Sequence, residues 1–145
     1  MHEPVFSFIF TYETFRIMKH KPSDSELEIM QVLWENGPLT VREVNDHLNR
    51  QRRVGYTTTL KIMQIMTEKM MLTRDTEQRS HIYTPVMEPE EIQSSILDHV
   101  VKTAFRGKTS SMVLRALGHH KASHEELEEI RMLIERIEKR GDGDI

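Results

Sequence analysis

The stretch that most constrains the fold of this chain is residues 54–71, VGYTTTLKIMQIMTEKMM, which predict an amphipathic helix with two unlike faces. With about 100° between successive residues, one face gathers side chains that can pack, namely Thr59, Ile62, Met63, Met66 and Met70. The opposite face carries Thr57, Lys61, Gln64 and Glu68, with Thr58 at its edge. Short hydroxyls followed by a cation and an amide can contact base edges and phosphates in a DNA major groove. The same face also suits plain contact with solvent, so the neighbouring elements must decide.

Composition limits the chain to one compact core and a small satellite domain. It has 145 residues, of which 37% are hydrophobic, and no cysteine. The lack of cysteine excludes disulfides and thiolate metal sites and suits a reducing cytoplasm. The apolar run of residues 5–12 is far shorter than the roughly 20 residues of a membrane span. We therefore expect a soluble, cytoplasmic protein without direct membrane insertion.

The formal net charge of −3 is unusual for a nucleic-acid binder, but the charge is unevenly distributed. Residues 22–40 carry four acidic and no basic residues, and residues 87–145 carry twelve acidic and nine basic residues. Residues 41–86 instead carry eight basic and five acidic residues. The positive charge thus surrounds the helix that could contact DNA, although the excess is mild enough for an ordinary mixed surface.

Residues 1–21 form an N-terminal extension without the helical pattern that begins at Pro22. The extension could be a strand, an arm that packs on a partner, a disordered segment, or translated upstream sequence. We favour the last, with Met18 as the natural start, because Met18 leads directly into the first capped helix. No function is assigned to it.

Two capping boxes predict two helices before the central one. Ser23 and Glu26 begin the first, which Gly37-Pro38 ends. Its apolar stripe contains Leu27, Met30, Leu33 and Trp34, so Trp34 is expected in the core and not as a ligand platform. Thr40 and Glu43 begin the second, which ends near Asn49 and packs through Val41, Val44 and Leu48. The basic connector of residues 49–53 either follows a phosphate backbone or is a solvated loop.

The segment after the central helix predicts a β-hairpin: strand-like residues 72–76 and 81–84 flank a polar turn, and Pro85 ends the second run. Three helices and a hairpin predict a winged helix-turn-helix domain over residues 22–86. In this fold the second helix contacts the DNA backbone, the third enters the major groove and the hairpin contacts flanking phosphate. We expect base contacts from Thr57, Thr58, Lys61 and Gln64, and phosphate contacts from Arg42, Arg53, Arg74, Arg79 and His81.

Residues 87–140 predict three further helices with apolar stripes, the second ended by Gly118 and the third begun by a Ser123-Glu126 capping box. Three small helices cannot bury these stripes alone. We expect them to interlock with a second copy, as a two-fold DNA site requires, and the alternative is a monomeric helical cap. The predicted dimerisation residues are Ile92, Ile96, Leu97, Val100, Val101, Phe105, Val113, Leu117, Leu127, Ile130, Ile134 and Ile137. Residues 141–145 should be a disordered tail.

Two alternatives to DNA binding are a metal or catalytic site and a winged helix that docks a protein. His119, His120 and His124 are the only candidate metal ligands, but Gly118 and the Ser123 cap place them in a loop and no carboxylate or thiolate completes the set. We therefore expect no metal, no cofactor and no catalysis. A winged helix can also dock a protein instead of DNA. Steep salt dependence of binding would favour DNA, because phosphate contacts release counterions.

In order and spacing, these residues resemble the penicillinase-repressor family, the BlaI/MecI/CopY type of bacterial transcriptional repressor. The resemblance covers about residues 22–138. Its pieces are Ser25-x-Leu27-x-x-Met30-x-x-Leu33-Trp34, Thr40-Val41-Arg42-Glu43-Val44, Tyr56-Thr57-Thr58, Glu68-Lys69, Arg79-x-x-x-Tyr83-x-Pro85 and Leu127-Glu128-Glu129-Ile130.

The resemblance implies a mainly α-helical homodimer that binds a palindromic operator through its winged helices, represses transcription and dimerises through its C-terminal helices. It adds Tyr56 to the expected DNA contacts. In the β-lactam branch of the family, a membrane-bound sensor protease triggers cleavage of the dimerisation domain. The matching region here is Leu114, Arg115, Ala116 and Leu117, where Arg115-Ala116 replaces the family's Asn-Phe pair. The copper-responsive branch uses paired cysteines, which this chain lacks.

Three further positions depart from the family's pattern. Met70 stands where the family usually has a glycine that ends the recognition helix, so we expect either a strained left-handed residue or a helix extended by one residue. Leu60 and Ile65 stand where relatives are often basic. This substitution predicts moderate affinity or recognition through thymine methyl groups.

Overall fold

The computed structural model describes residues 21–143 of the chain, with side chains described through residue 141. The predicted N-terminal extension up to residue 20 lies outside the described residues, as do residues 144–145 of the predicted tail. The chain divides after Leu97 into two compact units. Within residues 21–143, no helix is long and apolar enough to cross a bilayer.

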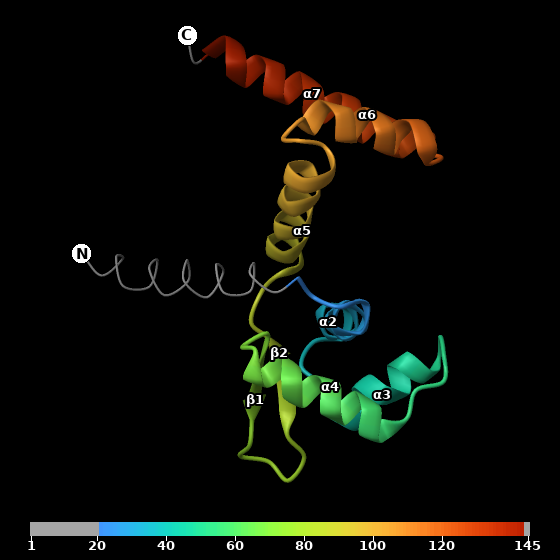
Figure 1. Cartoon of the computed structure of the whole chain (residues 1–145), viewed down its shortest axis with the longest axis vertical. Coiled ribbons are helices and arrows are strands. Elements are labelled where there is room, and N and C mark those ends of the chain that lie inside the picture. Colours follow the sequence, from blue (N-terminus) through green and yellow to red (C-terminus); the bar gives the residue numbers. More distant parts are fainter. Residues whose placement is uncertain (1–20, 144–145) are drawn as a thin grey trace, which may run out of the picture. The chain divides into compact units, whose positions relative to one another are not determined.

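The first unit is a winged helix. Its helices are α2 (Asp24–Asn36), α3 (Val41–Asn49) and α4 (Tyr56–Glu68), followed by the strands β1 (Leu72–Asp75) and β2 (Ile82–Pro85) (Figure 1). The prediction of three helices and a hairpin is therefore confirmed. Both predicted capping boxes form at the starts of α2 and α3. At the first, the Glu26 amide donates to Ser23 Oγ at 3.2 Å and the Ser23 amide donates to Glu26 Oε2 at 3.3 Å.

The hairpin is joined to the helical layer by a third segment. β1 and β2 pair antiparallel, with Leu72 opposite Pro85 and Arg74 opposite Tyr83. Leu39, in the turn between α2 and α3, accepts a hydrogen bond from the Tyr83 amide at 2.9 Å and donates one back at 3.3 Å. Because Tyr83 is also buried, this bridge fixes the wing against the helices.

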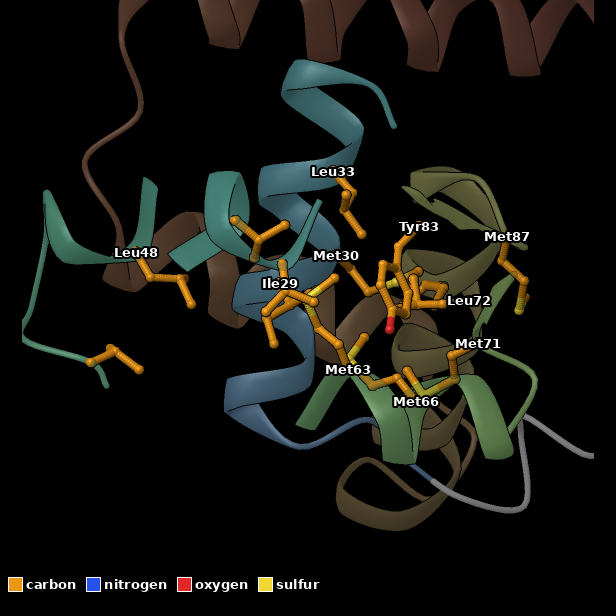
Figure 2. Close-up of a cluster of buried hydrophobic side chains, with 14 residues drawn as sticks. Ile29, Met30, Leu33, Leu48, Met63, Met66, Met71, Leu72, Tyr83 and Met87 are labelled. Atoms are coloured by element: carbon orange, nitrogen blue, oxygen red, sulfur yellow. The ribbon is translucent and has the colours of Figure 1, made fainter. Parts of the chain in front are cut away.

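The core of the first unit is rich in methionine (Figure 2). Met30 of α2, Met63 and Met66 of α4 and Tyr83 of β2 meet there. The other buried side chains of the cluster are Ile29, Leu33, Val41, Val44, Leu48, Val54, Met71, Leu72, Met87 and Ile92. Trp34 packs against this cluster, and its indole Nε1 donates to the Met87 carbonyl at 2.9 Å, which confirms its predicted place in the core. Met70 was expected on the packing face of the central helix, but its side chain is 39% exposed.

Helix α5 (Pro89–Ala104) begins within the first unit. Ile92 is only 2% exposed and belongs to the core described above, with Ile96 packed against it. The sequence predicted a domain boundary after residue 86, whereas the first compact unit of the structure ends at Leu97, inside α5. The physical reason is that the first turns of α5 complete the core of the winged helix.

The second unit contains α6 (Thr109–His119) and α7 (His124–Gly143). The Ser123-Glu126 capping box forms as predicted, with the Glu126 amide donating to Ser123 Oγ at 3.1 Å. Helix α6 extends one residue past Gly118, where it was expected to end, and α7 continues to Gly143 through part of the predicted tail. Among residues 98–141 no side chain is buried.

Candidate nucleic-acid interface

Helix α4 presents one polar face and one packed face. Thr59, Met63 and Met66 are buried in the core of the first unit. The four residues predicted to contact bases are all exposed, namely Thr57, Thr58, Lys61 and Gln64. The burial pattern therefore leaves this face free for a macromolecule, with the half-buried Leu60 on one side and the exposed Ile65 on the other.

The N-terminus of α4 lacks the side-chain cap that α2 and α3 have. Its N-cap is Gly55, whose φ of −72° any residue can adopt and which makes no side-chain hydrogen bond to the first turn. The backbone N–H groups at a helix start carry a partial positive charge and attract anions. The exposed hydroxyls of Thr57 and Thr58 therefore lie in a turn that favours contact with phosphate or electronegative base edges.

Two asparagines of α3 hold the chain that enters α4. Asn45 Nδ2 donates to the Val54 carbonyl at 3.1 Å and to Thr59 Oγ1 at 2.8 Å. Asn49 Nδ2 donates to the same carbonyl at 2.9 Å, and Asn49 Oδ1 accepts from the Val54 amide at 3.2 Å. Sequence reasoning missed these residues. The available signal was Asn45 beside the apolar positions of a short amphipathic helix, where a polar side chain needs a buried partner.

A groove of about 320 Å³ lies between the starts of α3 and α4 and the wing. It brings together four of the predicted contact residues, Arg42, Tyr56, Arg79 and His81, and its other lining residues are Thr40, Val41, Leu60, Ser80 and Tyr83. No acidic residue lines it. The Arg42 guanidinium carbon lies 5.9 Å from the centre of the Tyr56 ring, a cation–π distance. Arg53 and Arg74 do not line the groove.

The cations of the first unit differ in whether they are already paired. In the connector before α4, Arg52 Nη2 lies 3.0 Å from Glu28 Oε2, so this arginine is engaged by α2. Within the described residues no ion pair is recorded for the predicted contact cations Arg42, Arg53, Lys61, Arg74 and Arg79. These five side chains can neutralise DNA phosphates without first breaking an internal ion pair.

The capping box at the start of α3 also sets the charge of Glu43. Hydrogen bonds from the Thr40 backbone amide and hydroxyl lower the pKa of the Glu43 carboxyl. Burial opposes this shift, and the charge of nearby His47 adds a lesser lowering of the pKa. A negative charge is favourable in the first turn of a helix. It also orders the helix start that forms one wall of the groove.

Of the two alternatives expected for Met70, a left-handed residue or a helix extended by one residue, the structure has the left-handed residue. The helix ends at Glu68, and Met70 has a φ of 63°, so the chain turns through a left-handed residue and the helix is not extended. Just before it, Lys69 Nζ lies 2.7 Å from Glu26 Oε1 of α2. This ion pair fixes the end of the helix from which β1 departs.

The histidines considered as metal ligands do not form a site. His119 is the last residue of α6 and His120 caps it, while His124 begins α7. Across residues 21–143, no group of three or more His, Cys, Asp or Glu residues is arranged to hold a metal ion.

Comparison with known proteins identifies the family of this chain. Residues 22–136 match the model of the penicillinase repressor family. The penicillinase repressor of Bacillus licheniformis is 26% identical over 118 residues, which are 81% of this chain and 92% of that protein. The transcriptional regulator BlaI of Mycobacterium tuberculosis is 31% identical over 75 residues, 51% of this chain and 54% of that protein.

A solved structure is also similar. The solution structure of the DNA-binding domain of the repressor BlaI has 27% sequence identity and a TM-score of 0.44, over 49% of this chain and 89% of that one. The family match covers most of the chain and includes every predicted contact residue. The chain therefore belongs to the penicillinase repressor family and is a DNA-binding transcriptional repressor, not an enzyme.

Proposed function

We propose that this repressor acts as a homodimer on a palindromic operator and blocks transcription sterically. The observation that carries the proposal is the exposed polar face of α4, held over a buried methionine core. Two such helices in one dimer would enter successive major grooves about 34 Å apart. Base contacts come from Thr57, Thr58, Lys61 and Gln64 of that face.

Backbone contacts come from residues around this helix. Arg42, Tyr56, Arg79 and His81 line one groove of about 320 Å³, and none of its lining residues is acidic. Arg53 and Arg74 extend the positive surface on the connector and the wing. A cation that is already in an ion pair must leave that pair before it can bind a DNA phosphate. The absence of an ion pair for Arg42, Arg53, Arg74 and Arg79 within the described residues therefore supports their assignment as phosphate contacts.

Dimerisation is assigned to the apolar side chains that a single chain leaves uncovered. On α6 and α7 these include Val113, Leu117, Ile134 and Ile137, the last of them 56% exposed. Leu114 and Leu133, which the sequence analysis did not select, are also exposed. Their burial by a second copy would be favourable at about 25 cal/mol per Å² of apolar surface. Val100, Val101, Phe105, Leu127 and Ile130 are partly covered and stay in the set, as does the exposed Leu97.

Ile92 of α5 leaves the proposed dimer set, whereas the partly buried Ile96 stays in it. Ile92 and Ile96 already pack within the winged helix, so Ile92 has almost no surface to offer a second copy. The remaining residues lie on α5 after Ile92 and on the two following helices.

Relief of repression by proteolysis is the second part of the proposal. The matching segment, residues 114–117, lies inside α6 with exposed side chains. A membrane-bound sensor protease, acting directly or through a signal, would require local unfolding of this helix before the backbone could be cut. Because the segment adjoins the proposed dimer residues, cleavage there would remove apolar contacts and release the DNA.

The test is fluorescence anisotropy with the duplex that the full chain enriches from a random-sequence pool, against a scrambled duplex at two salt concentrations. We expect preference for the enriched duplex and a log affinity that falls steeply with log salt. Lys61→Ala should weaken the enriched duplex more than the scramble, while the control Lys121→Ala, outside the interface, should weaken neither. No preference, with little salt dependence, would overturn the proposal in favour of a protein-docking winged helix.

A further inference from the structure

We infer that Asn45 is a positioning residue for DNA recognition: its buried amide fixes the rotation of the first turn of α4 and so aims Thr57 and Thr58. The inference rests on the proposed function, in which the exposed face of α4 contacts bases. It concerns a residue that makes no contact with DNA itself, because Asn45 is only 9% exposed and lies beneath the helix start.

The hydrogen bonds of Asn45 reach both sides of the helix cap. One Nδ2 hydrogen goes to the carbonyl of Val54, the residue before the Gly55 cap. The other goes to Thr59 Oγ1, one turn into the helix, at 2.8 Å. Thr59 is fully buried and its hydroxyl in turn lies 3.4 Å from the Gly55 carbonyl, to which it donates. A single side chain therefore fixes both the segment that enters α4 and the first turn of the helix.

Asn49 completes this arrangement from the next turn of α3. Its Oδ1 accepts from the Val54 amide, and its Nδ2 donates to the Val54 carbonyl at 2.9 Å and to the Asn45 backbone carbonyl at 2.8 Å. Asn45 Oδ1 lies within 3.2 Å of the same Nδ2. Both backbone polar groups of Val54 are thus paired with side chains of α3. These bonds are directional, and each weakens steeply when its geometry is lost.

Farther along α4 the contacts are mainly apolar: Met63 and Met66 are buried, and Leu60 and Ile62 pack against the same core. Methionine side chains are flexible and adapt to irregular gaps. Hydrophobic packing is also non-directional. The ion pair of Lys69 with Glu26 lies at the far end of the helix, about three turns from Thr57 and Thr58. The hydroxyl of Thr59 is the buried polar group of the helix, so its bond to Asn45 fixes where Thr57 and Thr58 point.

The effect on recognition follows from the geometry of base contacts. A hydrogen bond to a base edge needs the donor and acceptor at a defined distance and angle. Contacts to phosphate are less demanding, because they depend mainly on charge. Loss of the Asn45 amide should therefore reduce discrimination between sequences and leave the salt dependence of binding unchanged.

The experiment compares full-length variants on the enriched duplex and on its scramble, well below their unfolding temperatures. Asn45→Ala and Thr59→Val should each lower the ratio of the two affinities by about tenfold. The double variant should lose little more, because both changes remove the same bond. Thr59→Ser, which keeps the hydroxyl, should retain the wild-type ratio.

Two controls separate positioning from stability. Asn36→Ala removes an asparagine whose amide bonds only the Val32 carbonyl within α2, and it should leave the ratio unchanged. Val44→Ala opens a cavity in the core beneath α3, so it should lower the unfolding temperature without lowering the ratio.

Every outcome bears on one of the two claims. A wild-type chain that enriches no sequence would overturn the proposed function and this inference with it. If the wild type discriminates and Asn45→Ala and Thr59→Val discriminate equally well, only the inference is wrong. A fall in the ratio for Val44→Ala that matches its loss of stability would also overturn it, since discrimination would then follow stability.

Discussion

Lys69 Nζ lies 2.7 Å from Glu26 Oε1 and joins the last turn of α4 to the first turn of α2. The Glu26 side chain is only 7% exposed, and its second oxygen accepts the Ser23 amide in the capping box. One buried carboxylate therefore begins one helix and fixes the end of another. Since α4 carries the proposed base contacts, this pair supports the interface from the end opposite Asn45.

We expect Lys69→Ala to lower the free energy of unfolding by about 1–2 kcal/mol, because it leaves the buried carboxylate without its cation. The measurement is urea unfolding followed by circular dichroism. The control is Arg52→Ala, which breaks the exposed Arg52–Glu28 pair and should cost about 0.5 kcal/mol or less. Equal losses for the two variants would contradict the special role of Glu26.

Met70→Gly should raise the free energy of unfolding by up to about 1 kcal/mol, since glycine adopts a φ of 63° without the penalty of a side chain. Part of the gain is offset by the greater freedom of glycine in the unfolded chain. The matched control is Glu68→Gly in the last helical turn, which should lower stability because that residue is helical. A loss of stability for Met70→Gly would show that the turn is not strained.

The helices and the hairpin could be predicted from local chemistry. Capping boxes such as Ser23 with Glu26 act between residues three apart, so the sequence alone identifies them. The place of Ile92 could not be found this way. An apolar stripe looks the same whether it packs on its own domain or on a second copy, and only the tertiary fold distinguishes the two.

The sequence predicted which residues of the candidate interface are exposed, but not the hydrogen bonds and the ion pair that hold α4 in place. Thr57, Lys61 and Gln64 follow from the helical period of α4. The bonds of Asn45 to Thr59 and of Lys69 to Glu26 join residues 14 and 43 positions apart. No periodicity or spacing connects such pairs, because the path of the chain between them decides whether they meet.

The capping box of α3 predicts a pH dependence of stability. Because hydrogen bonds from Thr40 hold the pKa of Glu43 below its ordinary value of 4.5, ionised Glu43 stabilises the folded state above that pH. The contribution is lost as the pH falls through the lowered pKa. Glu43→Gln keeps a hydrogen-bond acceptor but cannot ionise, so it should be less stable by about 0.5 kcal/mol near neutral pH.

The difference between the wild type and Glu43→Gln should close as unfolding is measured at successively lower pH below 4.5. Glu35→Gln serves as the control: Glu35 is exposed near the C-terminal end of α2, where a helix does not favour a negative charge, so this change should not destabilise the protein near neutral pH. A gap that stays constant over this range would mean that the ionisation of Glu43 does not contribute.

The contact of Arg42 with Tyr56 gives a prediction about DNA affinity. The ring beneath the guanidinium should hold Arg42 toward the groove that it lines with Arg79. Tyr56→Phe keeps the ring and should leave affinity for a scrambled duplex within about twofold, whereas Tyr56→Ala should weaken it by about two- to fivefold. If Phe and Ala weaken binding equally, the hydroxyl and not the ring carries the effect.

Ile92 and Ile134 each lie on the apolar stripe of their own helix, but substitutions at the two positions should have different effects. Ile134 of α7 is exposed in a single chain, so Ile134→Glu should place a charge in the proposed dimer face and shift the protein to monomers. Ile92→Ala should keep the dimer but destabilise the winged helix by about 2–4 kcal/mol, because it opens a cavity in the core. Light scattering after size-exclusion chromatography measures the oligomeric state, and urea unfolding measures the stability.

The control is Glu135→Gln, at the exposed residue next to Ile134, and it should alter neither the oligomeric state nor the stability. A monomeric Ile92→Ala with normal stability would return that residue to the dimer face, and a dimeric Ile134→Glu would place the contact between copies elsewhere.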